Sequence, residues 1–185
     1  MALEHHTQGP GWVPDEAYIH SRWEALRKPL NLSISSAYLD DDYDAIHAWI
    51  SNNKKIISIG RIHLIPPQSD GAMADHSGEG APTCPAFSPL NGENDFPSKN
   101  SLRPAAHIRQ MATAENQRRK GHAASVLHLL ESSCVEQWGC NSGWLQARLE
   151  AIPFYLSQGW KQFGSQYHIE KIGPHMSMWK QFRGV

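Results

Sequence analysis

The residues most able to do chemistry lie in one segment, Met111 to Ala123. It contains three consecutive cations and a glycine, in the order Arg118-Arg119-Lys120-Gly121-His122-Ala123. A strand predicted over Ala105–Met111 precedes this loop, and a predicted helix begins at Gly121. A strand, a tight glycine turn and a helix start together offer backbone N–H groups and the positive end of a helix to an anion. The pattern Arg-x-x-Gly-x-Ala therefore favours a pyrophosphate site over a solvated basic turn.

Composition narrows the class of protein. A chain of 185 residues is long enough for a single domain with a sizeable core, and its net charge of −1 gives no overall attraction to nucleic acid or membrane. No window approaches the roughly 20 apolar residues that span a bilayer, and Met1–Pro10 lacks the apolar stretch of a signal peptide. The three cysteines, Cys84, Cys134 and Cys140, cannot all pair within one chain. These features predict a cytoplasmic protein.

Periodicity and turn residues predict an alternation of helices and strands. The stretch Glu4–Gly9 is too polar to be assigned as a strand, so the first predicted element is a helix. Gly60, within an apolar strand, predicts a bulge or a close approach. The predicted elements are a helix over Pro14–Arg27, strands over Asp44–Ile50, Ile56–Ile65 and Ala105–Met111, a helix over Gly121–Trp138, a strand over Trp144–Ala147, a helix over Ala151–Gln158, and strands over Trp160–Gly164 and His175–Phe182.

Two acidic segments interrupt this order. Residues 66–103 form a long insertion rich in proline and glycine, which we interpret as a solvated insertion in preference to an acidic lid for a cationic substrate. The run Asp40-Asp41-Asp42 is interpreted as a solvated turn in preference to a cation site. Without a repeat or a second domain, residues 1–185 are expected to form one mixed α/β (α+β) domain with helices packed on a sheet.

Three blocks in sequence order resemble the GCN5-related N-acetyltransferases, the GNAT superfamily. They are Ile108–Thr113 with Arg118–Ala123, then Ala151–Trp160, then Ile172–Met178. The last block is similar to an ending found in the ElaA-like and YjcF-like branch. Comparable N-terminal segments are Arg22–Pro29, Asp40–Asp44, His47 and Gly60-Arg61. The resemblance implies an acyl-CoA N-acyltransferase fold, with a central, mostly antiparallel sheet that is splayed between its fourth and fifth strands.

The resemblance also implies an activity and a set of roles. An acetyl group would pass from acetyl-CoA, without a metal, to an amine by direct attack through a tetrahedral intermediate. Tyr155 matches the tyrosine beside the CoA sulfur, where a phenol can protonate the leaving thiolate. Gln146 stands where the branch often has asparagine. The residues implied to bind the co-substrate are Met111, Ala112, Thr113, Arg118, Arg119, Lys120, Gly121, His122, Ala123 and Gln146.

The general base that deprotonates the amine stays open. Glu115 and His175 are the candidates we favour, and His63 and His107 are further ones. A small-molecule amine, a protein lysine and a protein N-terminus all fit as acceptors. A homodimer through the exposed last strands is compatible with the fold.

Other functions fit less well. A metal-dependent hydrolase would need ligand spacings such as His-x-x-x-His or Cys-x-x-Cys, and neither occurs. A P-loop is excluded because its glycine–lysine motif is missing. The main alternative is a non-catalytic CoA-binding or interaction protein that keeps the fold.

Overall fold

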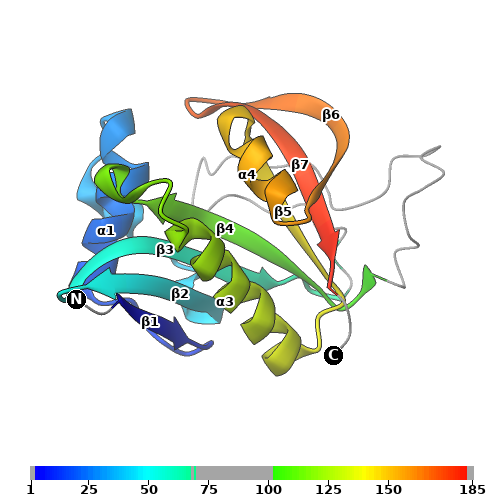
Figure 1. The fold of residues 1–185 in the computed structure, drawn as a ribbon, viewed down its shortest axis with the longest axis horizontal. Helices are drawn as coiled ribbons and strands as arrows, with labels where there is room; N and C mark the ends of the chain where they lie inside the picture. The colour runs from blue at the N-terminus through cyan, green and yellow to red at the C-terminus, as the bar shows by residue number, and fades with distance from the viewer. Residues whose placement is uncertain (1–2, 68, 70–101, 183–185) are drawn as a thin grey trace.

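A seven-stranded sheet forms the centre of the computed structural model, which describes residues 3–67, 69 and 102–182 (Figure 1). The strand order is β1-β2-β3-β4-β5-β7-β6, and every neighbouring pair is antiparallel except β4 and β5. The mixed, mostly antiparallel sheet predicted from the sequence is therefore confirmed. The strands are β1 (Leu3–Gln8), β2 (Ala45–Asn52), β3 (Lys55–Leu64), β4 (Ala105–Thr113), β5 (Ser142–Arg148), β6 (Lys161–Ile169) and β7 (Gly173–Gln181).

In the described ranges, three α-helices pack around the sheet: α1 (Glu16–Leu26), α3 (His122–Trp138) and α4 (Ile152–Ser157). Asp15 caps α1 by accepting a hydrogen bond from the Tyr18 amide, and Gly139 ends α3 in the left-handed conformation. Helix α3 contacts β2, β3 and β4, whereas α1 contacts β3 and β4. The described part of the chain also contains short 3₁₀ segments: Lys28–Leu30, Ile34–Ala37, Asp42–Asp44, Glu115–Gln117 and Leu149–Ala151. No helix in the described ranges is both long and apolar enough to cross a membrane.

Strands β4 and β5 pair over a short distance and then diverge. Their pairing covers only three positions, Ala105–His107 against Ser142–Trp144. Beyond these rungs the two strands separate, and α4 lies on the β5 side of the opening (Figure 1). The splay implied by the family resemblance is thus present, and it divides the sheet into a β1–β4 half and a β5–β7 half.

A first strand exists, although none could be assigned from the sequence. β1 pairs antiparallel with β2, from Leu3 opposite Asn52 to Gln8 opposite His47. It is an edge strand, largely exposed, so it carries no alternation of apolar and polar residues. Besides this backbone pairing, the ring of His6 stacks on the ring of Trp49, with centroids 5.0 Å apart. The predicted insertion falls mostly outside the described residues, and so does Cys84.

The acidic turn is not solvated, which corrects the expectation for Asp41 and Asp42. Arg22 donates to both carboxylate oxygens of Asp42, at 2.7 and 2.8 Å. Arg61 bridges Asp41 and Asp42 at 2.6 and 2.8 Å, and Arg109 reaches Asp41 at 2.7 Å. Burial opposes ionisation of both acids, but the neighbouring guanidinium groups outweigh it and hold each pKa below its ordinary value. The turn is therefore the centre of a buried ion-pair cluster.

Candidate active site at the β4–β5 splay

A bulge in β4 marks the start of the splay. Gln110 and Met111 together stand opposite Gly60 of β3, and Gln110 has a φ of 56°. A Cβ atom on Gly60 would overlap the Met111 sulfur and would lie 2.9 Å from Leu130 Cδ1. Gly60 thus leaves the space that the bulged strand occupies, so the bulge and the close approach predicted from the sequence occur together.

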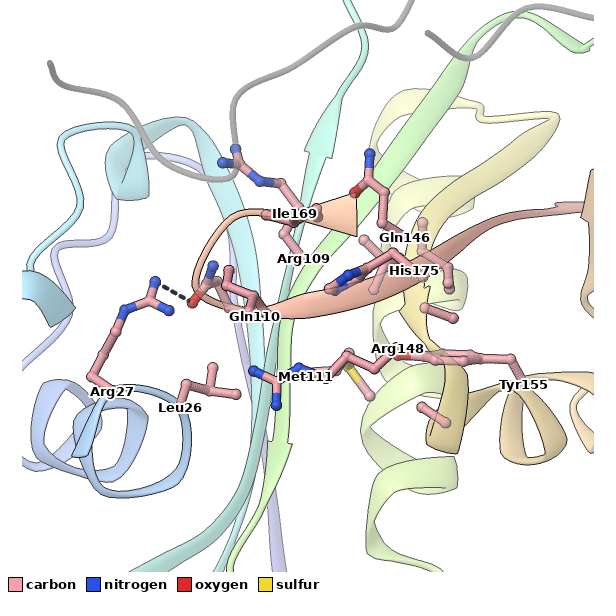
Figure 2. A pocket seen from close by; sticks show the side chains of 15 residues that line it. Leu26, Arg27, Arg109, Gln110, Met111, Gln146, Arg148, Tyr155, Ile169 and His175 are labelled. Carbon is pink, nitrogen blue, oxygen red and sulfur yellow. Dashed lines mark hydrogen bonds between the residues drawn. The ribbon is translucent and has the colours of Figure 1, made fainter. Parts of the chain in front are cut away.

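Two cavities meet at this bulge. A groove of about 570 Å³ runs between the N-terminus of α3 and α4, and a smaller cavity of about 150 Å³ lies towards α1 and the β6–β7 connection. Met111, Ala151 and Tyr155 line both. In Figure 2 the labelled side chains of the smaller cavity come from both sides of the splay. An elongated ligand in the groove would therefore present one end to a second ligand in the cavity.

The predicted phosphate loop lines the larger groove. Arg119 and Gly121 have φ values of 59° and 85°, so the loop turns through two left-handed residues. The first amide that donates within α3 is that of Ser125, at 3.1 Å from the Gly121 carbonyl oxygen. The amides of residues 122–124 consequently have no acceptor within the helix and are available to an anion. The loop residues that line the groove are Arg118, Arg119, Gly121, His122 and Ala123.

Other predicted binding residues lie as follows. Met111, Ala112 and Thr113 line the same groove. Lys120 does not line it and donates to Gln117 at 3.1 Å. Gln146 lines the smaller cavity instead, where its side-chain oxygen lies 2.7 Å from His107 Nε2.

Tyr155 stands where the two cavities join. Its ring packs against Phe154 and Trp160, with centroid distances of 4.9 and 6.2 Å. Within the described part of the chain, its hydroxyl has no hydrogen-bond partner, so it is available to a ligand. Burial raises the pKa of the phenol, which keeps it protonated at neutral pH. Burial therefore also widens the gap between the pKa of Tyr155 and the pKa of a thiol.

The candidate bases separate in space. His175 lines the smaller cavity, and its Nδ1 lies 2.8 Å from the Gly173 carbonyl oxygen. That contact requires a proton on Nδ1, which leaves the lone pair of a neutral ring on Nε2. Glu115 is exposed and lines a separate hollow beside α1.

The two further histidines, His63 and His107, are buried and lie outside the two cavities. Burial, aided by nearby arginines, lowers the pKa of His63 to about 3 and that of His107 well below its ordinary value. His63 contacts the backbone oxygen of Asp41 at 2.9 Å, and His107 stacks on Trp144 at a centroid distance of 4.3 Å. Neither lines the two cavities that Tyr155 joins.

Four polar residues of the smaller cavity were not predicted from the sequence as site residues: Arg27, Arg109, Gln110 and Arg148. Arg27 donates from Nη2 to the Gln110 side-chain oxygen at 2.9 Å, the dashed line in Figure 2. That bond connects residues 83 positions apart, so no local spacing reveals it. Arg27 does lie within the Arg22–Pro29 segment that resembles the family, whereas Arg148 lies in none of its three blocks.

Known proteins resemble this chain in sequence over its C-terminal part and in fold over nearly its whole length. Residues 97–182 match the model of the acetyltransferase (GNAT) domain. The uncharacterized N-acetyltransferase YitI of Bacillus subtilis is 32% identical over 79 residues, which are 43% of this chain and 52% of YitI. The chain thus matches about half the length of that curated relative.

Solved structures share the fold across nearly the whole chain. Escherichia coli ElaA has a TM-score of 0.61 and 16% identity, with 97% of this chain and 100% of ElaA covered. An acyl-CoA N-acyltransferase from Pseudomonas aeruginosa has a TM-score of 0.63 and 12% identity, with coverages of 97% and 99%. A sheet splayed between β4 and β5, with a helix N-terminus beside the opening, is the architecture of an acyl-CoA N-acyltransferase. Residues 97–182 thus match the GNAT domain, and the whole chain shares the fold of acyl-CoA N-acyltransferases, while a place in the ElaA-like branch stays a prediction.

Proposed function

We propose that this protein transfers an acetyl group from acetyl-CoA to the nitrogen of an amine. The observation that carries the proposal is the junction of the two cavities at Tyr155 and Met111. One cavity contains a loop suited to phosphates, and the other contains a buried histidine. Between them lies the edge of β4 that β5 leaves unpaired after three rungs.

The residues present fit a CoA thioester. The amides of residues 122–124 and the side chains of Arg118 and Arg119 suit a pyrophosphate. The unpaired edge of β4 beyond His107 offers backbone donors and acceptors to an amide-containing chain such as pantetheine. When bound, acetyl-CoA supplies an acetyl group activated as a thioester.

Two side chains would then move protons. His175 Nε2 takes a proton from the amine as its nitrogen bonds to the acetyl carbon. Tyr155 donates a hydrogen bond to sulfur as negative charge builds there, and it transfers its proton as the carbon–sulfur bond breaks. The products are an N-acetyl amine and the free CoA thiol, and both side chains regain their starting protonation through solvent. A backbone amide at the Met111 bulge would stabilise the oxyanion.

The first test is titration calorimetry with acetyl-CoA, with dephospho-CoA for comparison. We expect micromolar binding at one site, and no detectable binding to Gly121→Asp, because a carboxylate there repels phosphate. Gly139→Asp is the matched control, since it also has a left-handed φ, of 63°, but caps the opposite end of α3. Equal affinity in both variants and the parent protein would contradict the proposed phosphate site.

The second test addresses the chemistry. Tyr155→Phe should lower turnover by about 10²–10⁴-fold, as for loss of a positioned proton donor, while the affinity for acetyl-CoA stays unchanged. Tyr43→Phe, at a residue that is 60% exposed, serves as the control. His175→Gln should lower kcat/KM, whereas Glu115→Gln should not. A Tyr155→Phe variant with full turnover would favour a non-catalytic CoA-binding protein or another acid.

A further inference from the structure

The smaller cavity is lined by cationic side chains from three separate segments. Arg27 follows α1, Arg109 belongs to β4, and Arg148 ends β5. Among the described residues that line the cavity there is no aspartate or glutamate. Figure 2 shows Arg148 reaching from β5 into the cavity, and Arg27 pointing from the opposite side towards Gln110. The polar groups of this cavity therefore create a positive potential.

No interaction with the described residues explains why an arginine stands at position 148. It is half-buried and makes no hydrogen bond or ion pair with any residue in the described ranges. A guanidinium group offers five N–H donors in a planar fork that matches a carboxylate. Arg148 lines the cavity and has no partner among the described residues. Its guanidinium group is consequently available to bind an anion.

Arg27 and Arg109 are held in place by hydrogen bonds to neighbouring residues. Arg27 is 6% exposed and donates to the Ser36 carbonyl oxygen at 3.2 Å as well as to Gln110. Arg109 is 4% exposed and shares the carboxylate of Asp41 with Arg61. Burying guanidinium groups is costly, so two buried arginines beside the cavity form a prepared site.

The rest of the lining is apolar and the space is small. Leu26, Ile108, Leu145, Ile169 and Ile172 surround a volume of about 150 Å³. A cationic chain such as a protein lysine or a polyamine would meet arginines at the polar wall and would gain no compensating acid from this lining. A short molecule with an apolar body and an anionic group fits both features.

We propose that the acceptor is a small amine that carries a carboxylate, of the α-amino acid class, with the carboxylate bound by Arg148 and Arg27. The proposal rests on the proposed acetyl transfer. The amine would lie towards His175 and Tyr155, and the apolar side chain would lie against Leu26, Ile169 and Ile172. Arg109 is not assigned a bond to the carboxylate, because its Nη1 is already paired with Asp41.

The experiment compares matched acceptors with one protein. L-leucine, L-methionine and L-phenylalanine are each assayed with acetyl-CoA beside their primary amides and their decarboxylated amines. We expect the amino acids to have a kcat/KM at least about tenfold higher than the matched amides and amines, because charge-assisted hydrogen bonds discriminate strongly. Preference for the amides or amines would overturn the inference, and so would a lack of reaction with every probe by a protein that binds acetyl-CoA.

Variants locate the effect. Arg148→Gln should raise the KM for the amino acids about tenfold or more, with little change for the amides and none in acetyl-CoA affinity. Arg148→Lys should recover part of the loss because it keeps the charge but not the fork. Arg27→Gln should act in the same direction, and Lys28→Gln, at an exposed neighbour over the Trp23 ring, is the control. Equal losses for amino acids and amides would contradict carboxylate binding, whereas failure to bind acetyl-CoA at all would contradict the proposed function itself.

Discussion

The two halves of the sheet are stabilised by different means. On the α1 side of the β1–β4 half, three buried arginines surround the carboxylates of Asp41 and Asp42. The buried side chains of the β5–β7 half are mostly apolar and include Trp144, Trp160 and Phe163. Backbone pairing between the halves is limited to the three rungs of β4 and β5, while one apolar cluster includes side chains of both. The first half should therefore depend on charge and pH, and the second on shape.

The largest expected effect is acid destabilisation of the β1–β4 half. Burial lowers the pKa of His47 to about 4 and of His63 to about 3. An unfolded histidine takes up a proton near pH 6.5, so the unfolded state binds more protons than the native state between pH 6.5 and 4. The two histidines therefore leave the free energy of unfolding undiminished above pH 6.5. On acidification each should lower this free energy by on the order of 3 kcal/mol.

Urea denaturation between pH 7.5 and 4 measures this slope. His63→Gln should make it shallower, and His128→Gln, at an exposed position of α3, should leave it unchanged. Hydrogen exchange should show the loss of protection in β2 and β3. A stability that stays constant from pH 7 to 4 would remove the charge-dependent side of the comparison.

Removing one carboxylate should have the next largest effect. Asp42→Ala leaves Arg22 and Arg61, both 0% exposed, with less compensating charge. Breaking a buried ion pair from one side typically costs about 3–5 kcal/mol. Chemical denaturation should show that loss, while Asp40→Ala, at the exposed neighbour, should change stability by less than about 0.5 kcal/mol. Equal effects of the two substitutions would mean that the cluster contributes little.

In the β5–β7 half, a change of shape replaces a change of charge. A Cβ on Gly143 would lie 2.6 Å from Phe182 Cζ and 2.8 Å from Trp160 Cη2. Gly143→Ala should cost about 1–3 kcal/mol through overpacking, with the same cost at pH 7 and pH 5. Gly9→Ala is the control, because its nearest atom, at 3.0 Å, is the flexible end of Gln137. A cost that depends on pH would show that the halves are not distinct.

The smallest effect on stability is expected at the β4 bulge. Gln110→Gly relieves a φ of 56°, worth about 1–2 kcal/mol, but removes the acceptor of the Arg27 hydrogen bond. The net change in the free energy of unfolding should stay within about 1 kcal/mol. The KM for the amino acid substrate should rise instead, because Arg27 loses the side chain that orients it. A thermal melt and steady-state kinetics on the same sample separate the two, and a large loss of stability with an unchanged KM would contradict this role.

The sequence predicted the elements whose signals are local. The strands around Ile59 and Ile108 alternate or are continuously apolar, and Gly139 and Gly159 end their helices with left-handed φ values. The loop at Gly121 could be predicted because the glycine and its cations are adjacent in the chain, and its binding of phosphate stays a prediction. Gly60 within an apolar strand correctly indicated the bulge.

The remaining features depend on partners far apart in the chain. The aspartates at 41 and 42 looked solvated because Arg61 and Arg109 lie 19 to 68 positions away. β1 was missed because an exposed edge strand needs no apolar pattern. Arg148 carries no local mark of the cavity that it lines, since only the splay brings it near Arg27.

The contact of Gly60 with Met111 has a consequence for how this chain can vary in descent. The missing side chain at position 60 is the space that the sulfur at position 111 occupies. A descendant that gains alanine at position 60 must shorten residue 111 or flatten the β4 bulge. Substitutions at the two positions should therefore be correlated. In an alignment of close relatives, a small residue at one should accompany a large residue at the other.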